Sequence, residues 1–524
     1  MKHRRPPWLW VALVTVMMMV LAACTGSSAE LDEAQAEIEQ LQADLAAAQT
    51  QVAAGSLETQ TVFVAGELAP AVEPQALGDG WANSESVRGG LHLVATFDSS
   101  GPDAWDIDAH PRVYFTSESY ASNWFNDTDE GKTLRESEDF ENFIGWHAVD
   151  AYSKEVIASA LYSYEGNIVR GPHGVGVSPD GQWGYVGWTE ETDSGRNNYV
   201  GVVNVRTMKL DKLMKQESWR EGALSAQALH HIQGWTDVDG NEYVILQWGF
   251  GATGGPHHIL SPNDDNRVHR SITREDVSPI GHPFTTPSPD GKWVYVSVGS
   301  NEIRSNHAPA AGVAKVNVDT GEVIYITGTG HHPIGITHTQ DGKFTYVVDG
   351  HASWLYKIDN ELNEVVDDTS TGIAGPYGIC LNWDETQAWI DGKGEGTHNR
   401  GNSMGVVDLT TFRAARNVGN LPFHLGGSAS SVDHCALHPD PDVNEIWVSN
   451  MAGWETIVID LNALEVEAYI PTPNGGDTHG MAFVWYDGGW DTGELMVDMG
   501  GPKSMALRAD IAARAAAAAA EASG

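Results

Sequence analysis

One repeated unit constrains the fold of this chain more than any other feature. A turn rich in Gly and Pro, an apolar strand, an acidic turn and an aromatic strand follow one another in residues 171–186, and the same order returns in 281–296 and 332–347. Weaker copies begin near Leu229, Gly375, Asp433 and Thr478. The starts lie roughly 44 to 58 residues apart, which suits units of four short strands. Seven such units predict an all-β fold, a seven-bladed β-propeller.

The last repeat is incomplete at the C-terminal end of the chain. Only 481–485 and 495–497 have the pattern of strands there. Three earlier segments, 91–97, 113–116 and 146–150, have strand patterns outside the other repeats. Pairing strands from both ends of the chain within one blade leaves a ring without an exposed edge. We therefore expect all three N-terminal segments to complete the seventh blade.

The chain begins as an export signal. Basic residues at 2–5 precede an apolar run that is shorter than the ~20 residues needed to span a bilayer. The tetrad Leu-Ala-Ala-Cys that ends at Cys24 resembles the lipobox of bacterial lipoproteins, in which the Cys is acylated. These features predict a signal peptide over 1–23 and a lipid anchor on Cys24, holding the protein at a membrane in the periplasm or at the cell surface. An ordinary signal peptide with an unrelated Cys is the alternative.

An apolar heptad follows in residues 24–54. Leu31, Ile38, Leu45 and Val52 are spaced by seven, and mostly Glu, Gln, Asp and Ala stand between them. About three heptads are near the minimum for a coiled coil. The segment therefore predicts a helical stalk through which copies of the chain associate as a homo-oligomer. A single amphipathic helix lying on the propeller is the alternative.

Composition sets the remaining boundaries. Residues 55–90 are rich in Gly, Pro, Ala and Glu, which suits a linker. Residues 506–524 are rich in Ala and lack an apolar stripe, which predicts a helical or frayed tail. No break in composition divides 171–490 into two domains. We therefore expect one propeller over 91–505.

Charge and cysteine content exclude some partners and sites. The chain has 30 basic and 71 acidic residues, a formal net charge of −41, so its surface would repel nucleic-acid phosphates. With one Cys assigned to the lipid, Cys380 and Cys435 allow one disulfide at most. They do not provide the closely spaced Cys ligands of a copper electron-transfer site. The 21 His and 19 Trp residues are more informative.

Histidines stand at or beside the start of the innermost strand in six of the seven predicted blades. They are His173, His230, His231, His282, His331, His332, His434 and His479. The fifth blade has Tyr377 instead. Because these strand ends converge at one mouth of the channel, their imidazoles form a ring suited to copper, zinc, nickel or iron. For any one of them, a buried His bonded near a turn is the alternative.

Other histidines fall on later strands or in loops, and we expect most of them at the surface. They are His257, His258, His307, His351, His398 and His424.

The propeller region resembles nitrous-oxide reductases, over about residues 171–490. Residues 197–212 end in Met-Lys-Leu-Asp-Lys, similar to the family's Met-Lys-x-Asp-Lys, and His230 or His231 stands where that family has a metal-binding His. Further similar segments are Pro172–Gly181, Pro262–Asp264 and Asp433–Cys435. The Ser-Pro-Asp-Gly turn is common to YVTN-type propellers, the superfamily that includes lactonases. The Met-Lys segment and the His ring are therefore the discriminating features.

The chain also departs from that family. The family has a His-His-Pro-His segment before its Met-Lys strand, whereas this chain has Arg170-Gly-Pro-His173 there and a His-His-Pro only at 331–333. No segment of this sequence resembles the family's C-terminal cupredoxin domain with its dinuclear copper site. The resemblance then implies that electrons come from a separate donor, a cupredoxin or a cytochrome. It leaves open whether the change at Arg170 disables the cluster.

The resemblance implies a tetranuclear copper–sulfide cluster held by seven imidazoles, with calcium as another candidate ion. The ligands it implies are His173, His231, His282, His331, His332, His434 and His479. The implied reaction is the two-electron reduction of nitrous oxide to dinitrogen and water. Trp235 and Tyr377 could wall the channel, and core packing explains them equally well.

Two other functions stay open. A non-catalytic YVTN-type propeller would act as a binding or surface scaffold, since one fold serves many functions. A lactonase-type metal hydrolase would need two or three carboxylates converging with Asn at the inner strand starts, where this chain offers His.

Overall fold

A computed structural model describes most of the chain from residue 90 onward, as part of a compact unit, Gln60–Gly524. The described residues are 61–62, 90–119, 143–163, 167–193, 195–216, 229–249, 256–273, 276–277, 280–298, 311–394, 403–418, 431–473 and 476–500, with 504, 507, 509 and 513–514 in the tail. The signal peptide, Cys24, the stalk and most of the linker and tail lie outside them. No helix within the described residues is long and apolar enough to cross a membrane.

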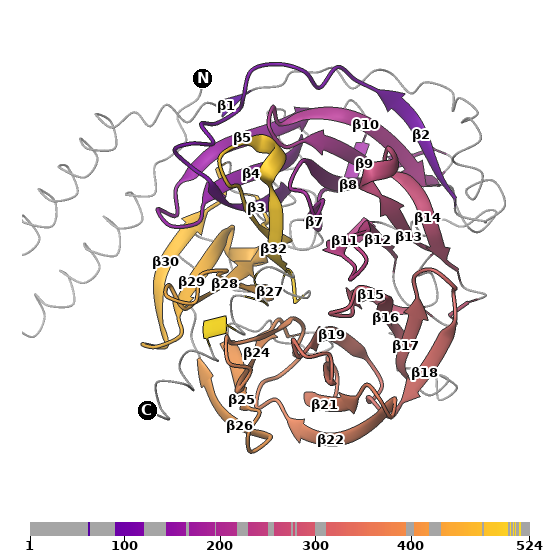
Figure 1. Ribbon diagram of the computed structural model, residues 1–524, viewed down its shortest axis with the longest axis vertical. Helices are drawn as coiled ribbons and strands as arrows, with labels where there is room; N and C mark the ends of the chain where they lie inside the picture. The colour runs from indigo at the N-terminus through magenta and orange to yellow at the C-terminus, as the bar shows by residue number, and fades with distance from the viewer. Residues whose placement is uncertain are drawn as a thin grey trace, which may run out of the picture. The chain divides into compact units, whose positions relative to one another are not determined.

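Seven sheets surround a central channel, and the expected seven-bladed all-β propeller is confirmed (Figure 1). Blade two contains β11 (Leu229–Thr236), β12 (Glu242–Trp248), β13 (His257–Ser261) and β14 (Arg267–Ile272). Blade three contains β15 (Ile280–Pro287), β16 (Trp293–Val298), β17 (Gly312–Asn317) and β18 (Val323–Thr327). Blade four contains β19 (Pro333–His338), β20 (Phe344–Asp349), β21 (Trp354–Asp359) and β22 (Glu364–Ser370). Blade five contains β23 (Ile379–Leu381), β24 (Gln387–Gly392), β25 (Ser403–Asp408) and β26 (Arg413–Val418). Blade six contains β27 (Val432–Leu437), β28 (Glu445–Asn450), β29 (Glu455–Asp460) and β30 (Glu465–Pro471).

Blades one and seven carry extra strands. Blade one contains β7 (Val175–Val177), β8 (Trp183–Thr192), β9 (Gly195–Asn204), β10 (Lys209–Gln216) and β2 (Leu91–Thr96), with β6 (Asn167–Arg170) also on β8. Blade seven contains β31 (Met481–Trp485), β3 (Arg112–Ser119), β4 (Phe143–Asp150) and β5 (Val156–Ser163), with β1 (Thr61–Val62) outside and β32 (Glu494–Asp498) next to β31. Short 3-10 turns are η2 (Pro262–Asp264), η3 (Met451–Gly453) and η4 (Trp490–Thr492).

Strands from both ends of the chain close the ring in blade seven, as expected for 113–116 and 146–150. The expectation for 91–97 was wrong. This segment forms β2, which pairs antiparallel with β10 as the outermost strand of blade one. Blade seven takes β5 as its outer strand instead, paired with β4. The physical reason is that β10 offers an unpaired edge, and β2 covers it.

The Ser-Pro-Asp-Gly turns of the repeat are built by local hydrogen bonds. The Ser178 hydroxyl bonds the Asp180 carboxylate and accepts the backbone N–H of Trp183 at 2.9 Å. Ser288 accepts the N–H of Trp293 in the same way at 3.0 Å. Gly181 closes the first turn with φ +67°, a left-handed conformation that Gly adopts without strain. These hydrogen bonds fix the residue at which the next strand begins, so the repeat has the same spacing between its two strands each time.

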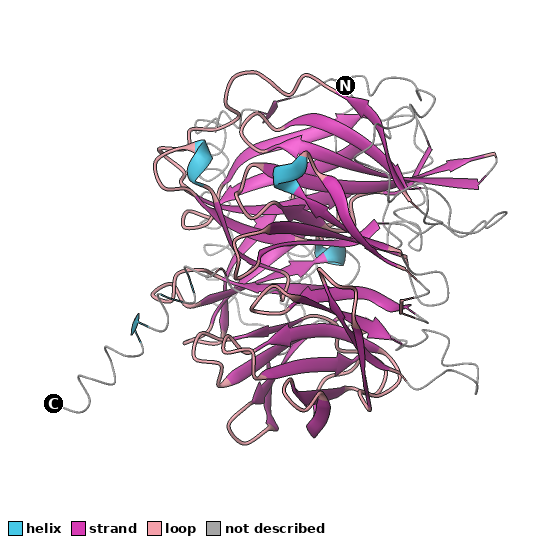
Figure 2. Cartoon of the chain, turned by 45° about the vertical axis from the view of Figure 1, so that its right-hand side comes forward, coloured by secondary structure: helices cyan, strands magenta, loops and turns pink. Residues whose placement is uncertain are grey.

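The core lies between neighbouring blades. The second strand of several blades contributes a fully buried aromatic side chain, and these are Tyr185, Tyr295, Trp389 and Trp447. Across the junction of blades seven and six, the rings of Tyr114 and Trp447 have centroids 4.7 Å apart. Burying such a ring stabilises the fold by roughly 1.5–3 kcal/mol. The aromatic strand of the repeat is therefore a packing signal between the sheets, whose strands are drawn in magenta in Figure 2.

The C-terminal segment lies on the channel side of the ring. Strand β32 contacts the inner strands β11 and β27. Gln233 Nε2 donates to the backbone carbonyl of Met499 at 2.7 Å. A Cβ atom on Gly500 would come within 2.9 Å of the carbonyl oxygen of Ile379 and 3.4 Å of that of Ile336. Residues 494–500 therefore cross the channel interior and fill it over part of its length.

Candidate metal centre

A short dipeptide places the histidines at one end of the inner strands. His173-Gly174 stands directly before β7, and His479-Gly480 stands directly before β31. A Cβ on Gly174 would lie 2.7 Å from the carbonyl oxygen of His230, and a Cβ on Gly480 would lie 2.4 Å from the backbone nitrogen of Val175. Only Gly allows such a close approach of adjoining blades. The residue before each Gly is thereby held close to the first residues of the next inner strand.

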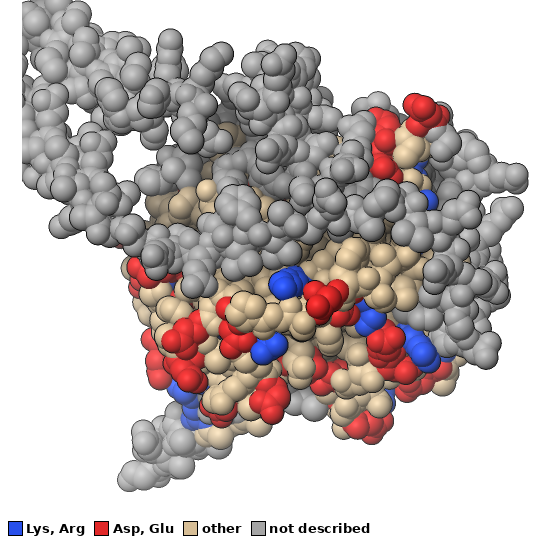
Figure 3. Space-filling model, turned by 90° about the horizontal axis from the view of Figure 1, so that it is seen from above, with Lys and Arg blue, Asp and Glu red and all other residues tan. Residues whose placement is uncertain are grey.

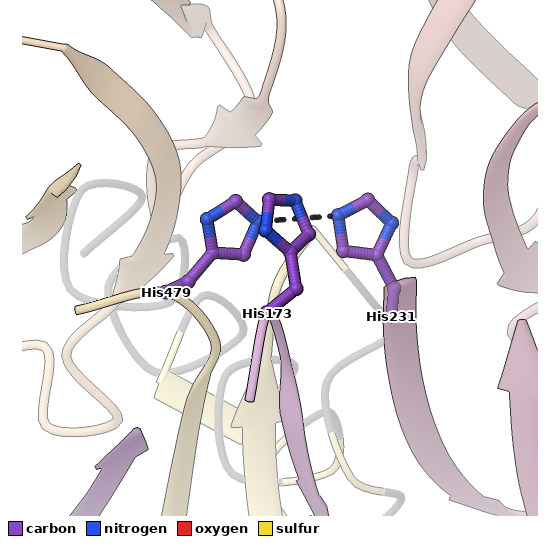
Figure 4. Close-up of side chains that lie close together, drawn as sticks. All are labelled: His173, His231 and His479. Carbon is purple, nitrogen blue, oxygen red and sulfur yellow. Dashed lines mark hydrogen bonds between the residues drawn. The ribbon is translucent and has the colours of Figure 1, made fainter. Parts of the chain in front are cut away.

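Three imidazole nitrogens from three blades meet at this end of the channel. His434 Nε2 lies 2.9 Å from His231 Nε2 and 3.1 Å from His479 Nε2. The third side of the triangle, His231 to His479, measures 3.5 Å and is drawn in Figure 4. Nitrogens bound to one tetrahedral ion at ~2.0–2.1 Å lie ~3.4 Å apart. One side of the triangle matches this spacing and the other two are shorter, so the three atoms are close enough to bind one metal ion together.

Hydrogen bonds alone cannot satisfy this triangle. The Nε2 atom of a neutral imidazole carries either a proton or a lone pair, so it either donates or accepts. Among three mutually contacting nitrogens, at least one pair then consists of two donors or two acceptors. A metal ion, in contrast, accepts three lone pairs at once. We call His231, His434 and His479 the three-His site.

Two further histidines adjoin the three-His site. The ring centroids of His173 and His479 are 3.4 Å apart, and those of His173 and His230 are 4.0 Å apart. One ligand atom from each of His173, His231 and His479 lies within 4.8 Å of the others, and Figure 4 shows these three side chains. All five side chains are at least 92% buried, since His173, the most exposed, has 8% of its surface accessible. The donor set is therefore rich in imidazole and poor in water contact.

Burial keeps the His434 imidazole in the neutral form that binds metals. It is the largest cause that lowers the pKa of His434 well below the usual value. Asp433 opposes this shift, and His231 and His479 add to it. A neutral imidazole has a free lone pair for a transition metal, whereas a protonated one has none.

A carboxylate behind the site orients one ligand. His479 Nδ1 lies 2.8 Å from Asp433 Oδ2, a close contact in which the negative charge favours a proton on Nδ1 and a lone pair on Nε2. Lys393 Nζ lies 3.4 Å from the other oxygen of Asp433. Beside them, burial in the first place and Asp433 in the second raise the pKa of the fully buried Asp391 well above its usual value. The carboxylate–imidazole pair is typical of metal ligands in proteins.

The floor of the site is apolar. The Phe284 ring lies 5.3 Å from the ring of His231 and 5.8 Å from that of His434, measured between centroids. On its other side, a Cβ on Gly500 would be 3.8 Å from Phe284 Cζ. Residues 494–500 therefore lie close to Phe284 and to the cluster.

The structure brings together four of the seven histidines expected as ligands: His173, His231, His434 and His479. His230, the alternative to His231, also adjoins them. His332 is elsewhere, with its ring centroid 4.3 Å from that of His351 and its backbone N–H bonded to Asp349. His331 is exposed. The side chain of His282 lies outside the part of the chain that the structure describes.

Among the other histidines, the surface expectation was wrong for His257 and His258, which are fully buried at the start of β13. His257 Nδ1 accepts the backbone N–H of Trp248 at 3.0 Å. The sequence reasoning missed Asp433 and Lys393 behind the ligands. Their signal was the direct adjacency of Asp433 and His434, since an acidic residue beside a ligand often orients a neighbouring imidazole.

A disulfide lies directly beside the site. Cys380 of β23 and Cys435 of β27 are joined, with Cα atoms 6.1 Å apart. Cys435 follows His434, and the bond ties this ligand's strand to blade five. A disulfide suits an oxidising, extracytoplasmic compartment.

The sequence matches no protein-family model, and no curated protein matches it either. Among solved structures, it is similar to dihydro-heme d1 dehydrogenase NirN in complex with DHE, at 14% identity and a TM-score of 0.44 over 79% of this chain and 82% of that one. It is similar to hydrazine synthase of Kuenenia stuttgartiensis at 16% identity and a TM-score of 0.42, over 62% and 92% of the two chains. The periplasmic gluconolactonase PpgL of Pseudomonas aeruginosa gives 14% and 0.46, over 71% and 98%. The propeller fold rests on the strand pairing described above, and these likenesses assign no activity.

Proposed function

We propose that this protein is an extracytoplasmic copper protein that reduces a small molecule, nitrous oxide, at a multinuclear centre in the propeller channel. The observation that carries the proposal is the meeting of three Nε2 atoms, from His231, His434 and His479, at 2.9 to 3.5 Å. His173 and His230 lie beside them and supply donors for more than one ion. The sequence resemblance to nitrous-oxide reductases supplies the choice of metal and substrate.

The residues present fit a redox metal better than a hydrolytic one. Imidazole suits copper, and the described side chains around the triangle contribute five imidazoles but only two buried carboxyl groups, Asp433 and Asp391. Asp433 is already paired with His479 and Lys393, and burial raises the pKa of Asp391 well above its usual value. A lactonase-type hydrolase would need several free carboxylates at the same place. When bound, copper would supply two electrons to nitrous oxide, which with two protons gives dinitrogen and water.

The chain's own residues would have three tasks. The histidines hold the ligand atoms in place before any ion binds, because their backbones lie on the inner strands of different blades. Asp433 favours a proton on Nδ1 of His479 and so a lone pair on its Nε2. Phe284 and residues 494–500 exclude water from below, which strengthens the electrostatic interactions within the site.

Electrons would come from a separate protein. Cys380 and Cys435 are joined in a disulfide, and Cys24 is the proposed site of acylation, so none of the three Cys residues remains as a copper thiolate ligand. The donor we propose is a cupredoxin or a cytochrome.

Lipid attachment at Cys24 would keep the propeller at the membrane, and the heptads of 24–54 would join copies of the chain. The substitution Cys24→Ala should release the protein or leave it unprocessed, as measured by membrane fractionation and mass spectrometry. A mature chain with an intact, unmodified Cys24 would refute the anchor.

Deleting 29–54 should convert oligomers to monomers in ultracentrifugation, and an ectodomain that is already monomeric would refute the stalk's role.

The central experiment is metal analysis of protein purified without oxygen, followed by nitrous-oxide reduction with a reduced viologen. We expect bound copper and turnover, both lost in His434→Ala. The matched control is His438→Ala, which removes another buried His of the same blade whose ring contacts Trp447 and Phe483 rather than the cluster. Protein without metal would favour the scaffold function, and metal-bound protein that hydrolyses lactones without reducing nitrous oxide would favour the hydrolase.

A further inference from the structure

Blade five carries a tyrosine where blades one and seven carry a ligand histidine. The sequence Gly375-Pro-Tyr-Gly-Ile379 matches Gly171-Pro-His-Gly-Val175 residue by residue, and each leads into the inner strand of its blade. Tyr377 therefore corresponds to His173.

The backbone environment of the two residues is also the same. A Cβ on Gly378 would lie 2.6 Å from the carbonyl oxygen of Asp433, just as one on Gly174 would lie 2.7 Å from that of His230. In both places the Gly packs on the pair of residues that includes a ligand of the next blade, Asp433-His434 or His230-His231. The fold therefore places Tyr377 beside the channel in the position that corresponds to His173 of blade one.

The hydroxyl of Tyr377 reaches the cluster. It lies 3.1 Å from His230 Nε2, a distance within the range of the contacts in the three-His site. The ring centroid of Tyr377 is 5.1 Å from that of His434 and 6.4 Å from that of His231, and the side chain is fully buried. An oxygen and a nitrogen at this separation can bind one ion together.

A cation lies against the ring of this tyrosine. Lys393 Nζ is 3.6 Å from the ring centroid of Tyr377. An ammonium in a dry site stabilises negative charge on the group it faces. Lys393 therefore places a positive charge directly beside the ring of Tyr377.

We propose that Tyr377 is a metal ligand, which with His230 binds an ion beside the three-His site through one oxygen and one nitrogen. This inference rests on the proposed metal function and changes its ligand set, because an oxygen donor replaces an imidazole on the ring. The phenol proton leaves to solvent as the oxygen–metal bond forms. Such a donor favours an oxidised ion such as Cu(II) or Fe(III).

The test is spectroscopic, because phenolate bound to Cu(II) or Fe(III) gives a charge-transfer band in the visible region that imidazole does not give. Purified protein would be loaded with either ion and its absorption and resonance Raman spectra recorded. We expect a phenolate band in the unchanged protein. Tyr377→Phe should lose this band and bind the last ion more than about tenfold more weakly. Tyr377→His should keep the metal content and lose the band.

The matched control is Tyr162→Phe, which removes another buried phenol whose hydroxyl donates to the carbonyl of Met208. This variant should keep the band. Thermal unfolding of each variant establishes that it is folded. Bound metal without a phenolate band, or an unchanged band in Tyr377→Phe, would overturn the ligand alone. A folded protein that binds no metal would overturn the proposed function and the ligand together.

Discussion

At the scale of single residues, a glycine that packs on the next blade brings the residue before it to the histidine cluster in blades one, five and seven. His173, Tyr377 and His479 each stand directly before the Gly that packs on the next blade. In blade four that place is taken by Ile334, which stands before Gly335. A Cβ atom added to Gly335 would lie 2.2 Å from the carbonyl oxygen of Tyr377. His332 stands two residues earlier and packs on His351 instead. The ring of histidines was thus predictable from the repeat, whereas its membership depended on a register that a count of His residues does not show.

The carboxylate of Asp433 gives a prediction at this scale. Asp433→Asn removes the charge that holds the proton on His479 Nδ1, while the amide keeps the size and one acceptor oxygen. We expect metal affinity to fall by about 10- to 100-fold, as is usual when a group behind a ligand is lost. Competition with a chelator of known affinity measures it. Asp408→Asn, at the end of β25 in blade five, where the carboxylate accepts the backbone N–H of Thr410, is the control and should leave affinity unchanged.

Buried histidines away from the centre make stability depend on pH. Burial, as the largest cause, lowers the pKa of His338 to about 3, against about 6.5 in an unfolded chain. Between these values the unfolded state binds more protons, so stability is full above pH 6.5 and is lost as pH falls toward 3. At pH 5 the loss amounts to about 2 kcal/mol from this one group.

Urea unfolding of metal-free protein at pH 7 and pH 5 tests this. His338→Gln can still bond the Thr345 hydroxyl, which lies 2.8 Å from His338 Nδ1, but it does not titrate. The variant should lose about 2 kcal/mol less than the unchanged protein over this pH range. Equal losses in the two proteins would contradict the assignment.

At the scale of elements, the strands and turns of each blade were predictable from local sequence signals. The pairing of strands that are far apart in the sequence was not. The Ser-Pro-Asp-Gly turns and the aromatic strands are local signals, and the sequence places each of them directly. The partner of β2 is β10, more than a hundred residues away, and nothing within 91–97 distinguishes the edge of blade one from that of blade seven. The strand itself was predictable, and its sheet was not.

The disulfide between β23 and β27 should stabilise the fold. Cys380 and Cys435 are 55 residues apart in the sequence, and closing a loop of this length is worth about 4 kcal/mol on the chain-entropy account. The double variant Cys380→Ser, Cys435→Ser should lose about that much in urea unfolding of the metal-free protein. Ile457→Val, in the same core cluster, should cost only about 0.5–1.5 kcal/mol. A double variant as stable as the unchanged protein would contradict this.

At the scale of the whole molecule, charge opposes compactness. The net charge is −41, and acidic side chains gather on the described part of the face in Figure 3, with basic ones between them. Self-repulsion destabilises a folded protein of such charge. Salt weakens this repulsion, because the screening length falls from about 10 Å at 0.1 M to about 3 Å at 1 M.

The thermal unfolding midpoint should therefore rise as sodium chloride is increased from about 0.05 to about 1 M, with most of the gain at the lower concentrations where screening sets in. Circular dichroism at fixed pH measures it. A neutral osmolyte at the same osmolarity is the control, because it acts without screening. A midpoint that does not respond to salt would show that the exterior charges lie too far apart to repel one another.

The closure of blade seven also has a consequence for timing during synthesis. A chain is made from its N-terminus onward, so β3 to β5 exist long before β31, and His479 is the last histidine of the three-His site to be made. Until that residue is present, His231 and His434 lack the third imidazole and blade seven lacks β31. A partly made chain therefore does not have the complete three-His site on which the proposed metal binding depends. The ring closes and the three-His site is completed in the same step, at the end of the molecule's assembly.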